Sequence, residues 1–245
     1  MKLSENIKSF CNKKIDHLFS DQNWEKQKKK KEKQNSTDTI FSETDARTKY
    51  ILHTATIMHG QCIEEIYLEA VKLLCDNLEV WEEKKFKVSK HALDISTDQA
   101  NNEVMKYELE YGDVAIIKTK KKTTQIDIIT YDKVKKEISS YEIKRAGSHH
   151  DRQKKEKIIA DIVATKILLK SYGEQKGLDV ASTRSYVIAH MNVPLLTPEW
   201  MKLQINGSDL DEHFDEPVSY QIENGLRYFE IEYKNRLKKY MSSAY

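Results

Sequence analysis

The stretch from residue 124 to residue 144 constrains the fold of this chain more than any other. It has the sequence T-Q-I-D-I-I-T-Y-D-K-V-K-K-E-I-S-S-Y-E-I-K. Two β-rich runs, residues 126–131 and 138–143, flank a polar connection of roughly four residues, which is typical of a β-hairpin. Pairing that is symmetric about this connection places Asp127 opposite Glu142 and Ile129 opposite Ser140.

The hairpin has two chemically different faces. Because side chains alternate along a strand, Lys144 shares the face of Glu142. The other face is predicted to be apolar and to carry Ile126, Ile128, Tyr141 and Ile143. Like charges opposite each other destabilise a strand pair, so Asp127 and Glu142 need a partner between them. A divalent cation such as Mg²⁺ suits two hard carboxylates, and a neighbouring lysine can orient a water or stabilise charge on a phosphate.

This pattern resembles the motif of the PD-(D/E)xK nucleases. Asp127, a gap of fourteen residues, and then Glu142, Ile143 and Lys144 correspond to it, although Ile126 stands where the family's proline would be. The resemblance implies that Asp127, Glu142 and the backbone carbonyl of Ile143 bind Mg²⁺. It also implies that Lys144 positions the attacking water.

Members of this family also open with a helix whose glutamate reaches the metal site, often shortly after a glycine. The sequence H-G-Q-C-I-E-E-I at residues 59–66 is similar to this feature. Glu64 is the predicted catalytic residue, and Glu65 is the alternative. A further alternative is that the glutamate is only an exposed surface residue of an amphipathic helix. Gly60 predicts a break or a close-packing point in that helix. Asp113 is a rival metal ligand.

The predicted order of elements points to the same family. We expect helices at 4–19, with Ser4 as its N-cap, at 42–78, and at 152–171, with Asp151 as its N-cap. A strand at 107–118 would begin the meander, and a strand at 185–192 would lie parallel to the central strand. This order resembles the α/β restriction-endonuclease-like core: a central mixed β-sheet with a hairpin carrying the active site, flanked by helices.

The chain length suits a single domain over residues 1–245. The family-like core covers about residues 50–192, an N-terminal helix and basic segment cover 1–41, and a helical region covers 193–245. No apolar run approaches the ~20 residues of a membrane span, and no apolar signal core is present, so a cytoplasmic protein is expected. Cys11, Cys62 and Cys75 fit no disulfide framework or zinc spacing, and we interpret them as reduced packing residues.

Basic residues gather near the hairpin although the net charge is only +2. Such blocks suggest a polyanionic partner, while solvated surface is the plain alternative. The predicted DNA-binding residues are Lys118, Lys120, Lys121, Lys122, Arg145, His149, His150 and Arg152.

The family resemblance implies a Mg²⁺-dependent endodeoxyribonuclease acting on double-stranded DNA. The chain most resembles a type II restriction endonuclease, which implies a homodimer and a separate cognate DNA methyltransferase. A structure-specific DNA repair or recombination nuclease of the same fold is an alternative. A non-catalytic nucleic-acid-binding protein with an accidental motif is another.

Overall fold

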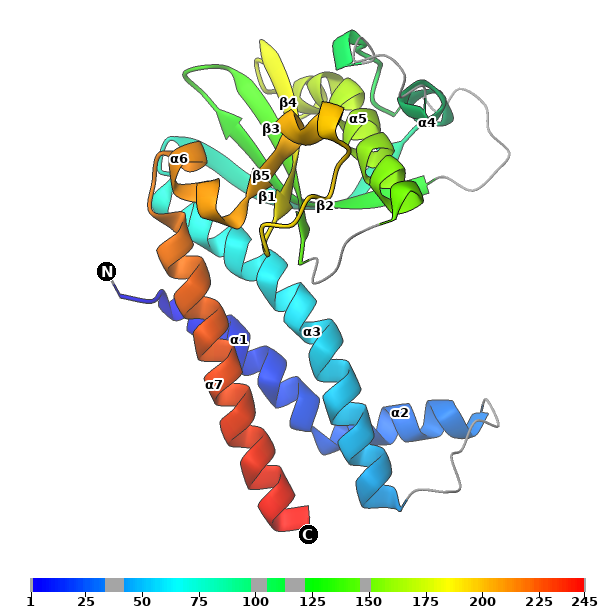
Figure 1. Ribbon diagram of the computed structural model, residues 1–245, viewed down its shortest axis with the longest axis vertical. Coiled ribbons are helices and arrows are strands. Elements are labelled where there is room, and N and C mark those ends of the chain that lie inside the picture. The colour runs from blue at the N-terminus through cyan, green and yellow to red at the C-terminus, as the bar shows by residue number, and fades with distance from the viewer. Residues whose placement is uncertain (1, 34–41, 98–104, 113–121, 146–150, 245) are drawn as a thin grey trace. The chain divides into compact units, whose positions relative to one another are not determined.

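A computed structural model describes residues 2–33, 42–97, 105–112, 122–145 and 151–244 of the chain (Figure 1). By its contacts the chain divides into two compact units. Residues 1–69 and 220–245 form a helical unit, and residues 70–219 form a sheet unit. That the chain folds as one domain stays a prediction. No helix in the described ranges is both long enough and apolar enough to cross a membrane.

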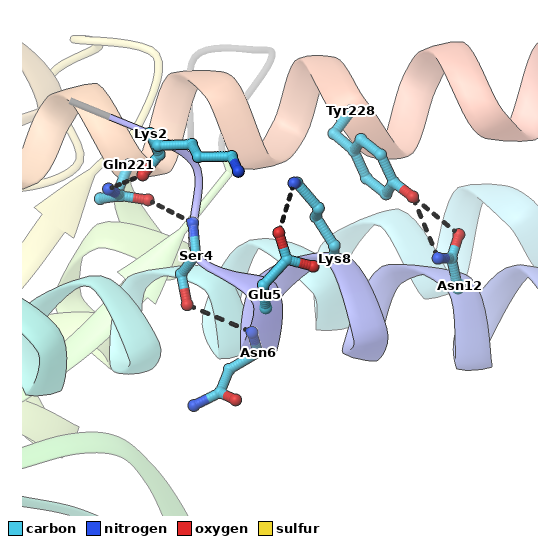
Figure 2. Close-up of polar contacts among 8 residues, drawn as sticks. All are labelled: Lys2, Ser4, Glu5, Asn6, Lys8, Asn12, Gln221 and Tyr228. Atoms are coloured by element: carbon cyan, nitrogen blue, oxygen red, sulfur yellow. Dashed lines mark hydrogen bonds and ion pairs between the residues drawn. The ribbon is translucent and has the colours of Figure 1, made fainter.

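Four helices contribute to the helical unit: α1 (Glu5–Phe19), α2 (Asp21–Lys33), α3 (Glu43–Leu74) and α7 (Val218–Ala244). The predicted N-cap of α1 is confirmed, because the Ser4 hydroxyl accepts the N–H of Asn6 at 3.2 Å. Buried Gln221 of α7 holds the start of the chain: its Oε1 accepts the N–H of Ser4 at 3.1 Å and its Nε2 donates to the Lys2 carbonyl at 3.0 Å (Figure 2). Further along the same two helices, Asn12 bonds to the Tyr228 hydroxyl.

The close contact among these helices occurs at Gly225 and not at Gly60. A Cβ atom on Gly225 would lie 2.9 Å from Ile66 of α3 and 3.0 Å from Ile7 of α1. The prediction for Gly60 was wrong, since α3 is continuous through this residue and its Cβ would meet nothing within 4 Å. The helix therefore accommodates Gly60 without needing it.

The sheet unit contains a five-stranded mixed sheet in the order β1-β2-β3-β4-β5. The strands are β1 (Leu78–Val88), β2 (Lys122–Asp132), β3 (Glu137–Lys144), β4 (Ser182–Ala189) and β5 (Gln204–Asn206). The first three strands run antiparallel, and β4 and β5 add in parallel. The described residues of this unit also form one long helix, α5 (Arg152–Gln175), and several short helical segments: α4 (Lys90–Thr97), the 3₁₀ helices Pro198–Leu203 and Gly207–Asp209, and α6 (Leu210–Phe214).

Helix α5 connects β3 to the parallel strand β4 and packs against the sheet (Figure 1). Its predicted N-cap is confirmed, because Asp151 Oδ1 accepts the N–H of Lys154 at 2.8 Å. The predicted parallel strand is confirmed as β4. The core beneath α5 includes Ile129, Tyr131, Ile138, Val163, Leu168 and Val187. The expected α/β architecture, with a mixed sheet flanked by helices, is thus present.

The predicted first strand of the meander was wrong. Residues 107–112 are not a strand, and residues 113–118 lie outside the described part. The strand that pairs with β2 is β1. Residues 107–112 bond to α5 instead: the N–H of Leu109 donates to the Ile167 carbonyl at 2.8 Å, and the Tyr111 ring packs edge-on against Tyr172 at 5.0 Å. Tyrosine-rich alternation is typical of a strand, but here the apolar side chains cover a helix.

Candidate active site

The hairpin has the register predicted from the sequence. Ile129 lies opposite Ser140, and Ile128 lies opposite Tyr141. The turn over residues 133–136 is closed by the Asp132 carboxylate, which accepts the N–H groups of Val134 and Lys135 at 2.9 Å each. Side-chain alternation puts Lys144 on the face of Glu142; continued past the last printed pair, Ile128 and Tyr141, the same register would put Asp127 on that face too. That face is the one covered by α5, since Ile129 belongs to the core beneath the helix.

The opposite face is less regular than predicted. Ile128 and Ile143 are buried, as expected for an apolar face. Ile126, however, belongs to the hydrophobic cluster beneath α5. The register between β1 and β2 shifts next to Ile126, at Glu83. Such an irregularity bends and twists a strand, which explains why a strict alternation did not hold at this end of β2.

The Asp127 side chain reaches across to β3. Its Oδ2 accepts the backbone N–H of Ile143 at 2.7 Å, and the side chain is buried, with 7% of the residue exposed. Backbone partners between the two strands run only as far as Ile128 and Tyr141, and the carboxylate provides the acceptor beyond them. A carboxylate bonded to the backbone is held in one position. Asp127 is thereby fixed beside the peptide that joins Glu142 to Lys144.

The Ile143 carbonyl points to the same side of β3 as its N–H. On the far side of β3, the N–H of His190 donates to the Lys144 carbonyl at 3.1 Å. Successive residues in a strand direct their peptide groups to alternate sides, so Lys144 bonds toward β4 and Ile143 toward β2. The predicted backbone ligand is therefore directed toward the strand that carries Asp127.

Glu142 and Lys144 form an ion pair at the accessible end of β3. About a third of each side chain is exposed: 33% for Glu142 and 36% for Lys144. They are two residues apart on one face, which brings the ammonium against the carboxylate. The Lys144 ammonium offsets part of the repulsion expected between Glu142 and Asp127. The accessible groups are thus one ammonium and one carboxylate.

The donor set is compatible with Mg²⁺. Two carboxylates and a backbone carbonyl are ligand types that suit a cation that takes one or two carboxylates and keeps several waters. Within the described residues, no group of three or more His, Cys, Asp or Glu side chains lies close enough to hold a metal. Asp127, Glu142 and Ile143 would be the protein ligands at this position.

A cavity of about 350 Å³ lies between the hairpin and α5. Glu142 and Lys144 line it from β3, and Lys154, Lys157 and Asp161 line it from α5. Neither the cavity nor these three helical residues were predicted from the sequence. The spacing of Lys154 and Lys157 was a usable signal, because residues three apart on a helix share a face.

The predicted DNA-binding residues lie partly within the described part of the chain. Arg145 is exposed directly after β3. Arg152, which is also exposed, begins α5 and pairs with Glu156 at 2.7 Å. Lys122 begins β2, where only the backbone is described. The residues that lie outside the described part are Lys118, Lys120, Lys121, His149, His150 and the rival ligand Asp113.

Glu64 and Glu65 lie on α3 within the helical unit, and both are half-buried. The metal or water contact assigned to Glu64 stays a prediction. The buried cysteines behave as expected of packing residues: burial raises the pKa of the Cys11 and Cys62 thiols to about 12 and that of Cys75 to about 11. These thiols are therefore protonated at neutral pH.

Comparison with protein-family models, with characterised proteins and with solved structures finds no match for this chain.

Proposed function

We propose that this protein is a Mg²⁺-dependent endonuclease that hydrolyses phosphodiester bonds in double-stranded DNA. The observation that carries the proposal is the fixed position of Asp127, whose carboxylate accepts the N–H of Ile143, the residue between Glu142 and Lys144. The order of elements supports it further. Three antiparallel strands, a crossover helix and a parallel strand resemble the restriction-endonuclease-like core, with the acidic hairpin at its centre.

Each residue of the site would have a separate role in hydrolysis. Asp127, Glu142 and the Ile143 carbonyl would hold the cation, which would supply a Lewis acid for the phosphate and would lower the pKa of a bound water. Lys144 orients the attacking water and donates to the phosphate oxygen that gains charge in the transition state. Hydrolysis forms one bond from the water oxygen to phosphorus and breaks one phosphorus–oxygen bond to a sugar.

Exposed basic residues beside the hairpin suit a duplex substrate. Arg145 follows β3 directly, and Arg152, Lys154 and Lys157 lie on the first turns of α5. Phosphate contacts of this kind position a protein on DNA without reading its sequence. By its resemblance to type II restriction endonucleases, the protein would act in the cytoplasm as a homodimer on a defined site. A separate DNA methyltransferase would protect that site.

Cleavage of linear phage DNA in Mg²⁺ tests the proposal. Lys144→Ala should lower the rate about 10²- to 10³-fold, as expected for loss of one transition-state donor. Lys135→Ala, at the far end of the hairpin, is the matched control and should cut normally. Discrete fragments from the wild type and the control alone support a site-specific enzyme.

Other outcomes distinguish the alternatives. A smear, or cutting confined to branched or damaged DNA, would favour a repair or recombination nuclease. Salt-dependent binding without cutting in Mg²⁺ would favour a non-catalytic DNA-binding protein and would refute the proposal.

A further inference from the structure

The cavity beneath α5 is lined by exposed charged residues and by buried neutral ones. Lys154 and Lys157 are exposed, and Lys144 is half-exposed; these three lysines form the rim. Ile158 and Asp161 also line the cavity and are half-buried. The rim therefore offers cations to an anion, and the buried lining offers a sheltered space to a group attached to it.

The innermost wall carries hydroxyl groups. Ser140 of β3 and Ser185 of β4 are adjacent across the strand pair, with 3% and 2% exposed, and their hydroxyls bond to each other at 2.7 Å. A hydroxyl has one donor hydrogen and two acceptor lone pairs. The hydrogen bond between the two serine hydroxyls uses one of their two hydrogens. The other hydrogen and the remaining lone pairs are left for a ligand. These groups can bond the polar edge of a ligand.

Aliphatic side chains line the cavity from both layers. Ile126 contributes from β2, and Ile158 and Ile162 contribute from α5. Apolar walls combined with a few polar groups are usual for sites that bury a small organic ligand. Such a lining suits a small organic group that has apolar faces and a polar edge.

The volume of the cavity limits the ligand to one base with its sugar. Ligand pockets range from about 300 to about 1,000 Å³, and this one, at about 350 Å³, is near the lower limit. A duplex cannot enter, whereas one base with its sugar can. The lysines of the rim line the same cavity as Glu142. The phosphate attached to that base and sugar would lie against these lysines.

We propose that the cavity receives the base of one unpaired nucleotide of the DNA substrate, with the nucleotide's phosphate on the lysine rim. This rests on the proposed function, because it assigns the cavity to the molecule that Glu142 and Lys144 act on. Extruding a base from a duplex costs unstacking and unpairing energy, and the cost is lowest where the base has no partner. The protein should therefore prefer DNA that already contains an unpaired base.

The test measures binding by the full-length protein in EDTA, so that no DNA is cut. The probes are a fully paired duplex, the same duplex with one bulged nucleotide, and a duplex whose bulged nucleotide lacks its base. The bulged duplex should bind about tenfold more tightly than the paired one, and loss of the base should remove most of that gain. Equal binding of the bulged and baseless probes would overturn the assignment.

Two variants locate the effect in the cavity. Ser185→Leu fills the inner end, and Ile158→Trp fills the half-buried wall and is the more tolerant substitution if the first fails to fold. Either should abolish the preference for the bulge and leave binding of the paired duplex unchanged. Ser182→Leu, on the exposed start of β4, is the control and should behave as the wild type. A bulge preference that survives in folded Ile158→Trp protein would refute the proposal.

Free deoxynucleoside 5′-monophosphates have the same chemistry as the proposed ligand. If they bind and Ile158→Trp prevents this, while the bulged duplex binds no better than the paired one, the ligand is a free nucleotide and the assignment to substrate fails. Cleavage in Mg²⁺ separates the two proposals. A bulge preference without cleavage contradicts only the nuclease function, and cleavage without a bulge preference contradicts only the role of the cavity.

Discussion

The carboxylate of Asp127 on β2 accepts the backbone N–H of Ile143 on β3 at 2.7 Å, in a buried position. This bond gives Asp127 two separable roles. It satisfies an N–H at the point where the backbone ladder between the strands ends. It also fixes a carboxylate at Ile143, the residue next to Glu142 in the chain, where the proposed cation would bind. Substitutions at Asp127 should separate stability from activity.

Asp127→Ala should destabilise the protein, whereas Asp127→Asn should be nearly neutral. Alanine leaves the buried N–H of Ile143 without its acceptor, which costs about 1–3 kcal/mol of unfolding free energy. The asparagine carbonyl can still accept, but it is a weaker metal ligand. Urea denaturation together with DNA cleavage checks this: both variants should be inactive, and only the alanine variant should be unstable. Equal stabilities would mean that the bond to Ile143 contributes nothing measurable.

Mg²⁺ should raise the melting temperature of the wild-type protein in the absence of DNA. A cation that binds only the folded state adds about 2.7 kcal/mol when present at 100 times its dissociation constant. Glu142→Gln should abolish this increase, and EDTA should reverse it. Glu137→Gln, at the opposite end of the same strand, removes the same charge from the protein and should keep the response. A Glu142→Gln protein that still responds fully would exclude Glu142 as a ligand.

Two glycine substitutions in the helical unit should have opposite effects. In Gly225→Ala the new methyl group would lie 2.9 Å from Ile66 and 3.0 Å from Ile7, and such overpacking costs about 1–3 kcal/mol. Gly60→Ala adds a methyl group with nothing within 4 Å and should stabilise α3 by about 0.5–1 kcal/mol. Denaturant midpoints of both variants check this. A stabilising Gly225→Ala would show that the helices can separate without cost.

The hairpin turn should contribute pH-dependent stability through Asp132. Hydrogen bonds from the N–H groups of Lys135 and Val134 hold the pKa of this carboxyl below its ordinary value. Because the folded-state pKa is the lower one, the stabilisation is present above the unfolded-state pKa of about 3.9 and is lost as the pH falls through the folded-state pKa. Asp132→Asn keeps the acceptor and removes the charge.

The stability difference between wild type and Asp132→Asn should therefore be largest near neutral pH and should shrink toward about pH 3. Urea midpoints measured across that interval test the sign. A difference that stays constant with pH would mean that the charge of Asp132 is not what the turn depends on.

Local sequence was sufficient for the hairpin and for the helix caps. The register of β2 and β3 follows from a four-residue turn closed by Asp132, and the caps at Ser4 and Asp151 follow from side chains that bond to their own helices. Each of these features depends on residues close together along the chain. The proximity of Lys144 to Glu142 could be predicted for the same reason, while the position of Asp127 opposite Glu142 stays a prediction.

Contacts between distant segments could not be predicted in this way. Leu109 bonds to Ile167 on α5, so a segment with strand-like alternation covers a helix, and β1 takes the place beside β2. The pairing of Ser140 with Ser185 and the approach of Asp161 on α5 create the cavity, and no local pattern marks them. The residues of the hairpin are enough to indicate which of its side chains lie together, because turn geometry and side-chain alternation act over a few residues. What covers that face follows from packing, which depends on the shapes of surfaces that meet after the chain has folded.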